Sequence, residues 1–132
     1  MPGRLIAMPK PGHTGFTRVV KATEYSIRGL KSAWRYESAF RQECTIAVIL
    51  LPFAFLLGQT LVQTALLIGV CLVVLITELL NSAVEATIDR MGEELHDLAG
   101  RAKDMSSAAV ALSLLLVWVT WGLVALERLR AL

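Results

Sequence analysis

The sequence predicts an all-α integral membrane protein in which an N-terminal amphipathic surface helix precedes three transmembrane helices. Hydrophobic residues make up 55% of the chain, and its mean hydropathy of +0.60 is well above that of an ordinary soluble domain. No charged residue lies between Glu43 and Glu78, or between Asp104 and Glu127. At roughly 20 residues per membrane helix, the first gap holds two crossings joined by a tight turn, and the second holds one.

The chain divides by composition into an arm and one membrane-embedded domain. Residues 1–14 are rich in proline and glycine, which predicts a disordered arm, and residues 15–132 are expected to form a single domain. The first 15 residues lack the apolar core of a signal peptide, so the first span is expected to direct insertion. Residues 1–43 carry eight basic and three acidic side chains, which predicts a cytoplasmic N-terminus.

An amphipathic helix is predicted over about residues 16–35. Apolar side chains at Phe16, Val19, Ile27, Leu30 and Trp34 recur at intervals typical of one helix face, and basic residues fill much of the remaining surface. A basic amphipathic helix of this kind lies in the membrane interface beside anionic headgroups.

Three membrane spans are predicted over about residues 39–58, 61–89 and 105–126. Pro52 lies inside the first span, where it can kink the helix. Residues 91–104 are expected to form a short cytoplasmic loop, with Asp104 as a candidate N-cap for the third span. The charge-free turn near Gly58 then faces outward. Cys44 and Cys71 lack Cys-x-x-Cys spacing, which predicts small, buried, apolar side chains.

A polar face at the end of the second span is the candidate functional site. On an α-helix, Asn81, Glu85 and Asp89 all fall within roughly 60° of Glu78. Ionisable groups at membrane depth are expensive and usually functional. Three helices are too thin to shield these side chains from lipid, so either they line a cleft with the amphipathic helix or the protein oligomerises. We predict an oligomer.

The chemistry of this site is restricted by the motifs that the chain lacks. There is no Gly-x-x-x-x-Gly-Lys-Ser/Thr loop, no protein-kinase motif set and no Gly-x-Ser-x-Gly elbow. The two histidines, His13 and His96, do not make a metal-binding pair. What remains is a set of carboxylates, of which Glu37 and Glu85 are suited to Mg²⁺ that bridges nucleotide phosphates.

The same residues suggest roles in phosphoryl transfer. Glu78 is surrounded by apolar neighbours, and a poorly hydrated carboxylate suits a general base. Asn81, one turn further on, is placed to orient the hydroxyl that Glu78 deprotonates. Arg18, Arg101 and Lys103 are available to neutralise phosphates.

Each of these residues also has a structural interpretation. Glu78 and Glu85 can form an interhelix hydrogen bond or a proton-transport path. The charged residues around the start of the first span can form interfacial ion pairs, and the acidic residues after Arg90 can belong to a solvated loop. The first group comprises Arg35, Glu37, Arg41 and Glu43, and the second comprises Glu93, Glu94 and Asp97.

Several blocks of the sequence resemble one family. Glu78-Leu-Leu-Asn-Ser-Ala-Val-Glu-Ala-Thr-Ile-Asp-Arg90, followed by Gly100-Arg-Ala-Lys-Asp-Met105, is similar to the signature of the bacterial integral-membrane diacylglycerol kinases. Gly15-Phe-Thr-Arg-Val-Val-Lys21 and Ala39-Phe-Arg-Gln-Glu43 match the same family upstream. The resemblance covers roughly residues 15–121.

The resemblance implies a homotrimer with active sites shared between neighbouring subunits at the cytoplasmic surface of the bacterial inner membrane. It implies Mg-ATP-dependent phosphorylation of diacylglycerol to phosphatidic acid, with Glu78 as general base, Asn81 beside it, and Glu37 and Glu85 as Mg²⁺ and ATP ligands. No nucleic-acid partner is expected. Further nucleotide contacts are implied at Arg18, Tyr25, Glu94, His96, Lys103 and Asp104, and lipid contacts at Arg18, Ala39, Phe40, Arg41, Gln42, Glu43, Glu78, Ser107 and Trp121.

Two other functions remain as alternatives at this point. One is a kinase of the same family that acts on undecaprenol, because the sequence features of the lipid groove are too weak to exclude it, although the extended basic N-terminal helix favours diacylglycerol. The other is a small proton-coupled transport or assembly subunit that uses Glu78 and Glu85 as a proton relay.

Overall fold

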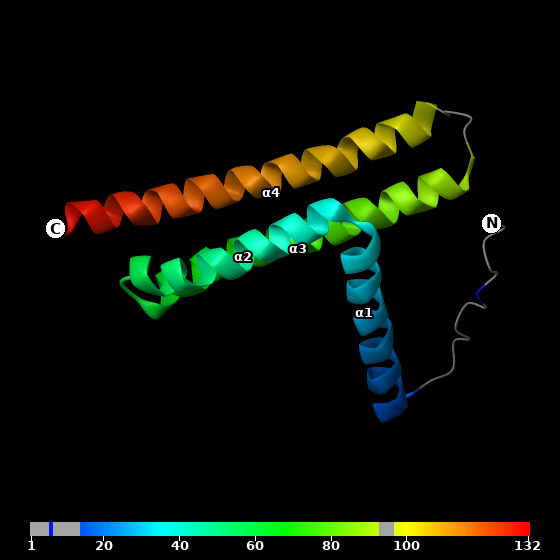
Figure 1. Cartoon of the computed structure of the whole chain (residues 1–132), viewed down its shortest axis with the longest axis horizontal. Helices are drawn as coiled ribbons and strands as arrows, with labels where there is room; N and C mark the ends of the chain where they lie inside the picture. Colours follow the sequence, from blue (N-terminus) through cyan, green and yellow to red (C-terminus); the bar gives the residue numbers. More distant parts are fainter. Residues whose placement is uncertain (1–5, 7–13, 93–96) are drawn as a thin grey trace. The chain divides into compact units, whose positions relative to one another are not determined.

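The computed structural model describes residues 6, 14–92 and 97–132, and all of its regular structure is helical. Figure 1 shows the four helices: α1 (Phe16–Tyr36), α2 (Ser38–Leu57), α3 (Leu61–Arg90) and α4 (Asp97–Arg130). The last three are each long and apolar enough to cross a membrane. The predicted all-α architecture with three candidate membrane spans is therefore confirmed. The predicted disordered arm lies almost entirely outside the described residues.

The chain forms two compact units, residues 1–32 and residues 33–132, and each is described by itself. Most of α1 belongs to the first unit. Gly15 precedes it with a φ of 63°, a left-handed conformation that suits glycine. On its surface, Lys21 Nζ contacts Glu24 Oε2 at 3.2 Å, one turn apart. The helix predicted over residues 16–35 is present, and its position on a membrane surface stays a prediction.

A tight turn joins α2 to α3. α2 continues through Pro52 and ends at Leu57. A side chain at Gly58 would meet the Ala54 carbonyl oxygen and the Thr64 amide nitrogen, both at 3.0 Å, so only glycine fits. The Thr60 hydroxyl then accepts a hydrogen bond from the Gln63 amide at 3.1 Å and caps α3. The turn predicted near Gly58 is thus confirmed.

α3 and α4 lie side by side and antiparallel, and their ends are joined by polar contacts (Figure 1). At one end, Gln63 Nε2 donates to Glu127 Oε2 at 2.7 Å. At the other end, Lys103 Nζ donates to Asp89 Oδ1 at 2.9 Å. α2 packs mainly against α3. α3 is therefore the central helix of the second unit.

The small apolar core of this unit lies towards the Gly58 end. It consists of the buried side chains Ala54, Leu67 and Val124, one from each of α2, α3 and α4. Trp121 packs against this core, and its indole Nε1 donates to the Leu67 carbonyl oxygen at 3.2 Å. The core therefore fixes all three helices at one end, away from the polar face of α3.

The start of α4 differs from the prediction. We expected a loop over residues 91–104 and a span from about Met105, but α4 begins at Asp97 and continues to Arg130. Asp104 lies inside this helix, so its interpretation as an N-cap was wrong. Charged side chains mark the end of the apolar stretch but not the end of the helix. Their polar groups are hydrated outside the membrane, and the backbone hydrogen bonds of the helix continue past them.

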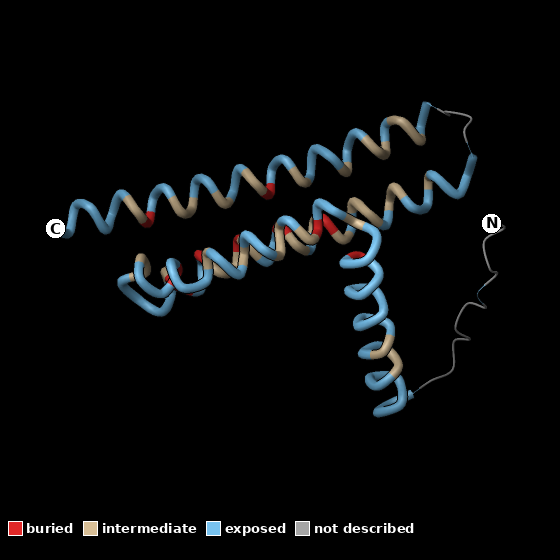
Figure 2. The backbone as a smooth tube through the Cα atoms, viewed as in Figure 1, coloured by how far each residue is buried: buried red, intermediate tan, exposed pale blue. Residues whose placement is uncertain are grey.

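Most of the apolar surface of the spans is exposed in the single chain (Figure 2). In the most apolar stretch of each helix, 33% of residues are buried in α3 but only 11% in α2 and in α4. Helices that are apolar on all sides are typical of a membrane environment. The chain therefore presents extensive surface to lipid or to other protein chains.

Candidate active site

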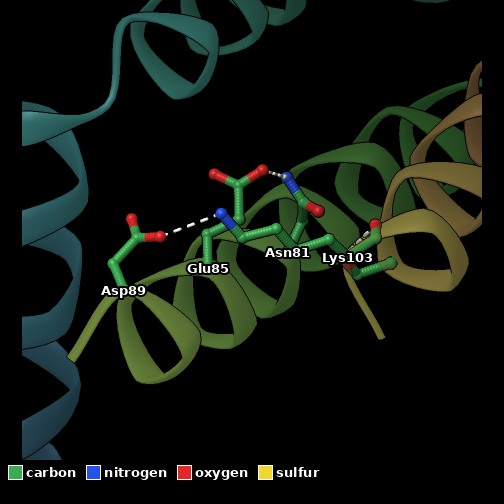
Figure 3. Close-up of polar contacts among 5 residues, drawn as sticks. Asn81, Glu85, Asp89 and Lys103 are labelled. Carbon is green, nitrogen blue, oxygen red and sulfur yellow. Dashed lines mark hydrogen bonds and ion pairs between the residues drawn. The ribbon is translucent and has the colours of Figure 1, made fainter. Parts of the chain in front are cut away.

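The polar face of α3 changes from buried to exposed along its length. Glu78 is only 6% exposed, Asn81 and Glu85 are half-buried, and Asp89 is exposed. The predicted sharing of one face agrees with Figure 3, which draws Asn81, Glu85 and Asp89 along successive turns. The inner carboxylate is thus the one most protected from solvent.

Asn81 is incompletely satisfied. Its Nδ2 donates to Glu85 Oε1 at 3.5 Å, the outer limit for such a bond (Figure 3). Its Oδ1 is buried and has no hydrogen-bond partner among the described residues. Buried polar atoms are normally paired, and an exception calls for an explanation such as a missing ligand. Asn81 therefore offers an unused acceptor and a second amide proton beside Glu78.

Three further carboxylates lie near Glu78. Glu43, Glu85 and Glu37 are all close enough to act on it electrostatically. Glu43 lies on α2, and Glu37 is the N-cap residue of α2, with φ −114° and ψ 105° and no side-chain capping bond. Helix α2 and the break before it therefore bring two carboxylates towards the two on α3.

The proposed alternative of interfacial ion pairs is not what the structure shows. Within residues 14–92 and 97–132, neither Glu37 nor Glu43 pairs with Arg35 or Arg41. The Arg41 guanidinium instead donates to the backbone carbonyls of Trp34 and Arg35. Within the described residues, Glu37 and Glu43 therefore have no ion-pair partner.

Two of these carboxylates are the predicted Mg²⁺ ligands. The described residues contain no group of three or more His, Cys, Asp or Glu side chains arranged to hold a metal. Mg²⁺ commonly takes only one or two carboxylates and completes its octahedral shell with phosphate oxygens and water. Glu37 and Glu85 are the two hard oxygen donors that the sequence predicts as Mg²⁺ ligands, and the charges of both reach Glu78.

A cationic side chain lies at the exposed end of the polar face. Lys103 of α4 reaches across to Asp89 of α3 (Figure 3). The pair is largely solvent-accessible, so it can exchange partners at little expense. Arg101 and Asp104 are exposed on the same part of α4. Sequence reasoning did not predict the contact of Lys103 with Asp89, because these residues are brought together only by the antiparallel packing.

The predicted lipid contacts fall into two groups in the structure. Ala39, Gln42 and Ser107 are exposed, whereas Phe40 is only 4% exposed. A cavity of about 160 Å³ lies beside Glu43 and is otherwise lined by apolar side chains of α2, α3 and α4. Trp121 lies further along and is hydrogen-bonded to Leu67. The lipid-binding role of all these residues stays a prediction.

Four predicted nucleotide contacts are not placed at the site by the structure. Arg18 and Tyr25 lie on the part of α1 that belongs to the first unit, where the Arg28 guanidinium lies 5.6 Å from the centre of the Tyr25 ring. Glu94 and His96 lie outside the described residues. Their predicted roles therefore remain untested.

Comparisons with known proteins agree on one family. A family model described as prokaryotic diacylglycerol kinase matches residues 24–125. A diacylglycerol kinase of Haemophilus influenzae is 50% identical over 109 residues, which cover 83% of this chain and 92% of the relative. A diacylglycerol kinase of Pseudomonas aeruginosa is 49% identical over 89% of this chain and 96% of its own, and one of Escherichia coli K12 is 47% identical over 82% and 88%.

Proposed function

Because this chain belongs to the prokaryotic diacylglycerol kinase family, we propose that it transfers the γ-phosphate of Mg-ATP to the primary hydroxyl of diacylglycerol, giving phosphatidic acid. The observation that carries the proposal is the buried Glu78, with Glu37 and Glu85 near it. One turn away lies the Asn81 oxygen, for which the described part of the chain supplies no hydrogen-bond partner. A poorly hydrated carboxylate beside a hydrogen-bonding amide suits the deprotonation of an alcohol.

In this mechanism Glu78 accepts the proton of the lipid hydroxyl as the hydroxyl oxygen bonds to the γ-phosphorus. The bond from that phosphorus to the β-phosphate oxygen breaks, and ADP leaves. The second amide proton of Asn81 donates to the hydroxyl oxygen and orients it. Glu37 and Glu85 would hold Mg²⁺, which would supply positive charge to neutralise the phosphates. Because the chain lacks a phosphate-binding loop, positioning and charge neutralisation carry the catalysis.

Lys103 neutralises the transferred phosphate in this proposal and exchanges Asp89 for a phosphate oxygen when nucleotide binds. The further nucleotide contacts are Arg18, Tyr25, Glu94, His96 and Asp104. The lipid contacts are Arg18, Ala39, Phe40, Arg41, Gln42, Glu43, Ser107 and Trp121.

We extend the proposal to the assembly and its location. The exposed apolar surface of α2 and α4 and the carboxylates near Glu78 favour a homotrimer in which a neighbouring subunit completes each site. The basic N-terminal segment favours a multi-pass protein of the bacterial inner membrane, with the N-terminus and the site on the cytoplasmic side. The amphipathic α1 then lies along that surface.

The test is a kinase assay on the purified protein in mixed micelles, with diacylglycerol and undecaprenol in competition, with and without Mg²⁺. We expect labelled phosphate from ATP to appear in phosphatidic acid only when Mg²⁺ and diacylglycerol are both present. Glu78→Gln should abolish this transfer, because the amide cannot accept the proton. Glu127→Gln is the matched control, since Glu127 lies at the far end of the α3–α4 pair and should leave activity unchanged.

Three outcomes would count against the proposal. Full activity in Glu78→Gln would remove the general base. Preferential phosphorylation of undecaprenol would assign the chain to the other alcohol. Proton flux without nucleotide turnover would favour a transport function instead.

A further inference from the structure

We infer that Arg41 is a positioning residue, whose guanidinium closes the end of α1 and thereby holds Glu37 in the break between α1 and α2. This inference rests on the proposed function for one point only, that Glu37 is a metal ligand. Its structural part, the control of the break by Arg41, stands on the contacts alone. All residues involved, from Ala33 to Arg41, belong to the second compact unit.

The break between the two helices consists of a single residue. α1 ends at Tyr36, α2 begins at Ser38, and only Glu37 departs from helical geometry, with φ −114° and ψ 105°. The segment from Trp34 to Arg41 contains neither proline nor glycine, and glutamate is itself a good helix former. Local sequence therefore favours one continuous helix, so contacts from further along the chain must maintain the break.

The Arg41 side chain supplies such contacts. Its Nη1 donates to the carbonyl oxygens of Trp34 at 2.7 Å and Arg35 at 3.2 Å. These carbonyls lie in the last turn of α1, where the helix leaves acceptors without a helical donor. A cation is also favoured at the negative end of the helix dipole. In a continuous helix these two carbonyls would instead accept backbone bonds, so the guanidinium stabilises the broken form.

Arg41 contacts both sides of the break. Its backbone amide donates to the Glu37 carbonyl at 3.2 Å, while the Glu37 amide donates to the Ala33 carbonyl at 2.9 Å. Ala33 and Phe40 are both buried, so the chain is also packed on either side of Glu37. The Glu37 side chain does not cap α2, which leaves its carboxylate available for a ligand. In this arrangement Arg41 determines where that carboxylate lies.

The neighbouring Arg35 provides a matched comparison. It carries the same charge in the last turn of α1, but its guanidinium lies 5.3 Å from the centre of the Tyr36 ring instead of on the helix carbonyls. We therefore expect Arg35→Met to leave the break intact. Arg41→Met removes both hydrogen bonds and the charge while keeping an unbranched side chain. Arg41→Lys keeps the charge, but an ammonium lacks the planar fork of the guanidinium.

The first measurement is amide hydrogen exchange across residues 33–41 in mixed micelles. We expect exchange at Glu37 and Ser38 to change at least about tenfold in Arg41→Met, less in Arg41→Lys, and not in Arg35→Met. Unchanged exchange in Arg41→Met would overturn the inference, whatever the activity. Arg41→Lys serves as the informative variant if Arg41→Met fails to assemble.

The second measurement is the Mg²⁺ concentration that gives half-maximal kinase activity, together with the KM for diacylglycerol. Mutation of a residue that orients a metal ligand typically lowers metal affinity by about 10–100-fold. We expect Arg41→Met to raise the Mg²⁺ requirement about tenfold, and any rise in the lipid KM reports separately on the proposed lipid contact of Arg41. An unchanged Mg²⁺ requirement would overturn the inference, whatever the lipid KM.

Glu37→Gln separates a failure of this inference from a failure of the proposed function. If Glu37→Gln leaves the Mg²⁺ requirement unchanged, the proposed metal ligand is wrong, and the exchange measurement alone decides the role of Arg41. If Glu37→Gln raises the requirement but Arg41→Met does not, the metal ligand stands and the positioning role of Arg41 is refuted.

Discussion

Replacing Trp121 with phenylalanine should weaken the packing of α4 on α3 by a small, measurable amount. The substitution removes the hydrogen bond from the indole Nε1 to the Leu67 carbonyl oxygen, 3.2 Å long, and keeps an aromatic ring against the buried core. Because Leu67 lies inside α3, its carbonyl keeps its helical donor and is not left unpaired. Interhelical hydrogen bonds in membranes average about 0.6 kcal/mol and reach about 1.7 kcal/mol.

We therefore expect Trp121→Phe to lower the free energy of unfolding by about 0.5–1.5 kcal/mol. Trp121→Ala, which also empties the space against Ala54, Leu67 and Val124, should lower it by about 3–5 kcal/mol. The assay is unfolding in mixed micelles by increasing SDS, followed by circular dichroism. Trp118→Phe is the control, because Trp118 lies on the same helix and is 78% exposed. It lines the cavity beside Glu43 but does not pack against the buried core.

Equal destabilisation in Trp121→Phe and Trp118→Phe would refute this reasoning. So would a Trp121→Phe variant with unchanged stability and a raised KM for diacylglycerol. The second result would leave Trp121 with its proposed lipid contact alone and would give its hydrogen bond no part in packing.

Three other substitutions test separate features. Gly58→Ala should destabilise the turn by about 1–3 kcal/mol, because the new methyl group would press on Thr64. The same SDS titration measures this loss, and wild-type stability would contradict the close approach of Gly58 to Thr64. Glu127→Ala should lower the free energy of unfolding by about 0.5 kcal/mol, because it removes the exposed hydrogen bond to Gln63. A clearly larger loss would contradict the interpretation of this bond as a weak surface contact. Glu85→Gln should raise the Mg²⁺ requirement of the kinase about tenfold or more without unfolding the protein, and an unchanged requirement would exclude Glu85 as a metal ligand.

The membrane spans could be predicted from the sequence because the bilayer makes charge distribution decisive. Two charge-free runs gave three crossings, and all three helices are present. The start of α4 could not be read in this way, since Arg101 and Asp104 are excluded from lipid but not from a helix. Hydropathy therefore located where the membrane run ends and missed the helical turns from Asp97 to Asp104.

The candidate site was predictable only where it depends on one helix. The 3.6-residue period sufficed to place Glu78, Asn81 and Glu85 on one face of α3. It contains no information about contacts between helices, so the approach of Glu43 and the pairing of Asp89 with Lys103 appeared only in the structure. The sequence does contain a signal for the pairing of Asp89 with Lys103. A cation and an anion lie on either side of a short connection between two antiparallel helices.

The buried Asn81 oxygen, which has no hydrogen-bond partner among the described residues, has a consequence for how this protein can be stabilised. A buried acceptor without a partner typically costs about 1–3 kcal/mol of folding free energy. Leucine, which has a similar volume and no polar atom, would avoid that penalty. A search for heat-resistant variants that measures folding stability alone would therefore favour Asn81→Leu, and the selected protein would lose its proposed kinase activity. Engineering of this chain for stability should hold position 81 fixed and seek its gains elsewhere.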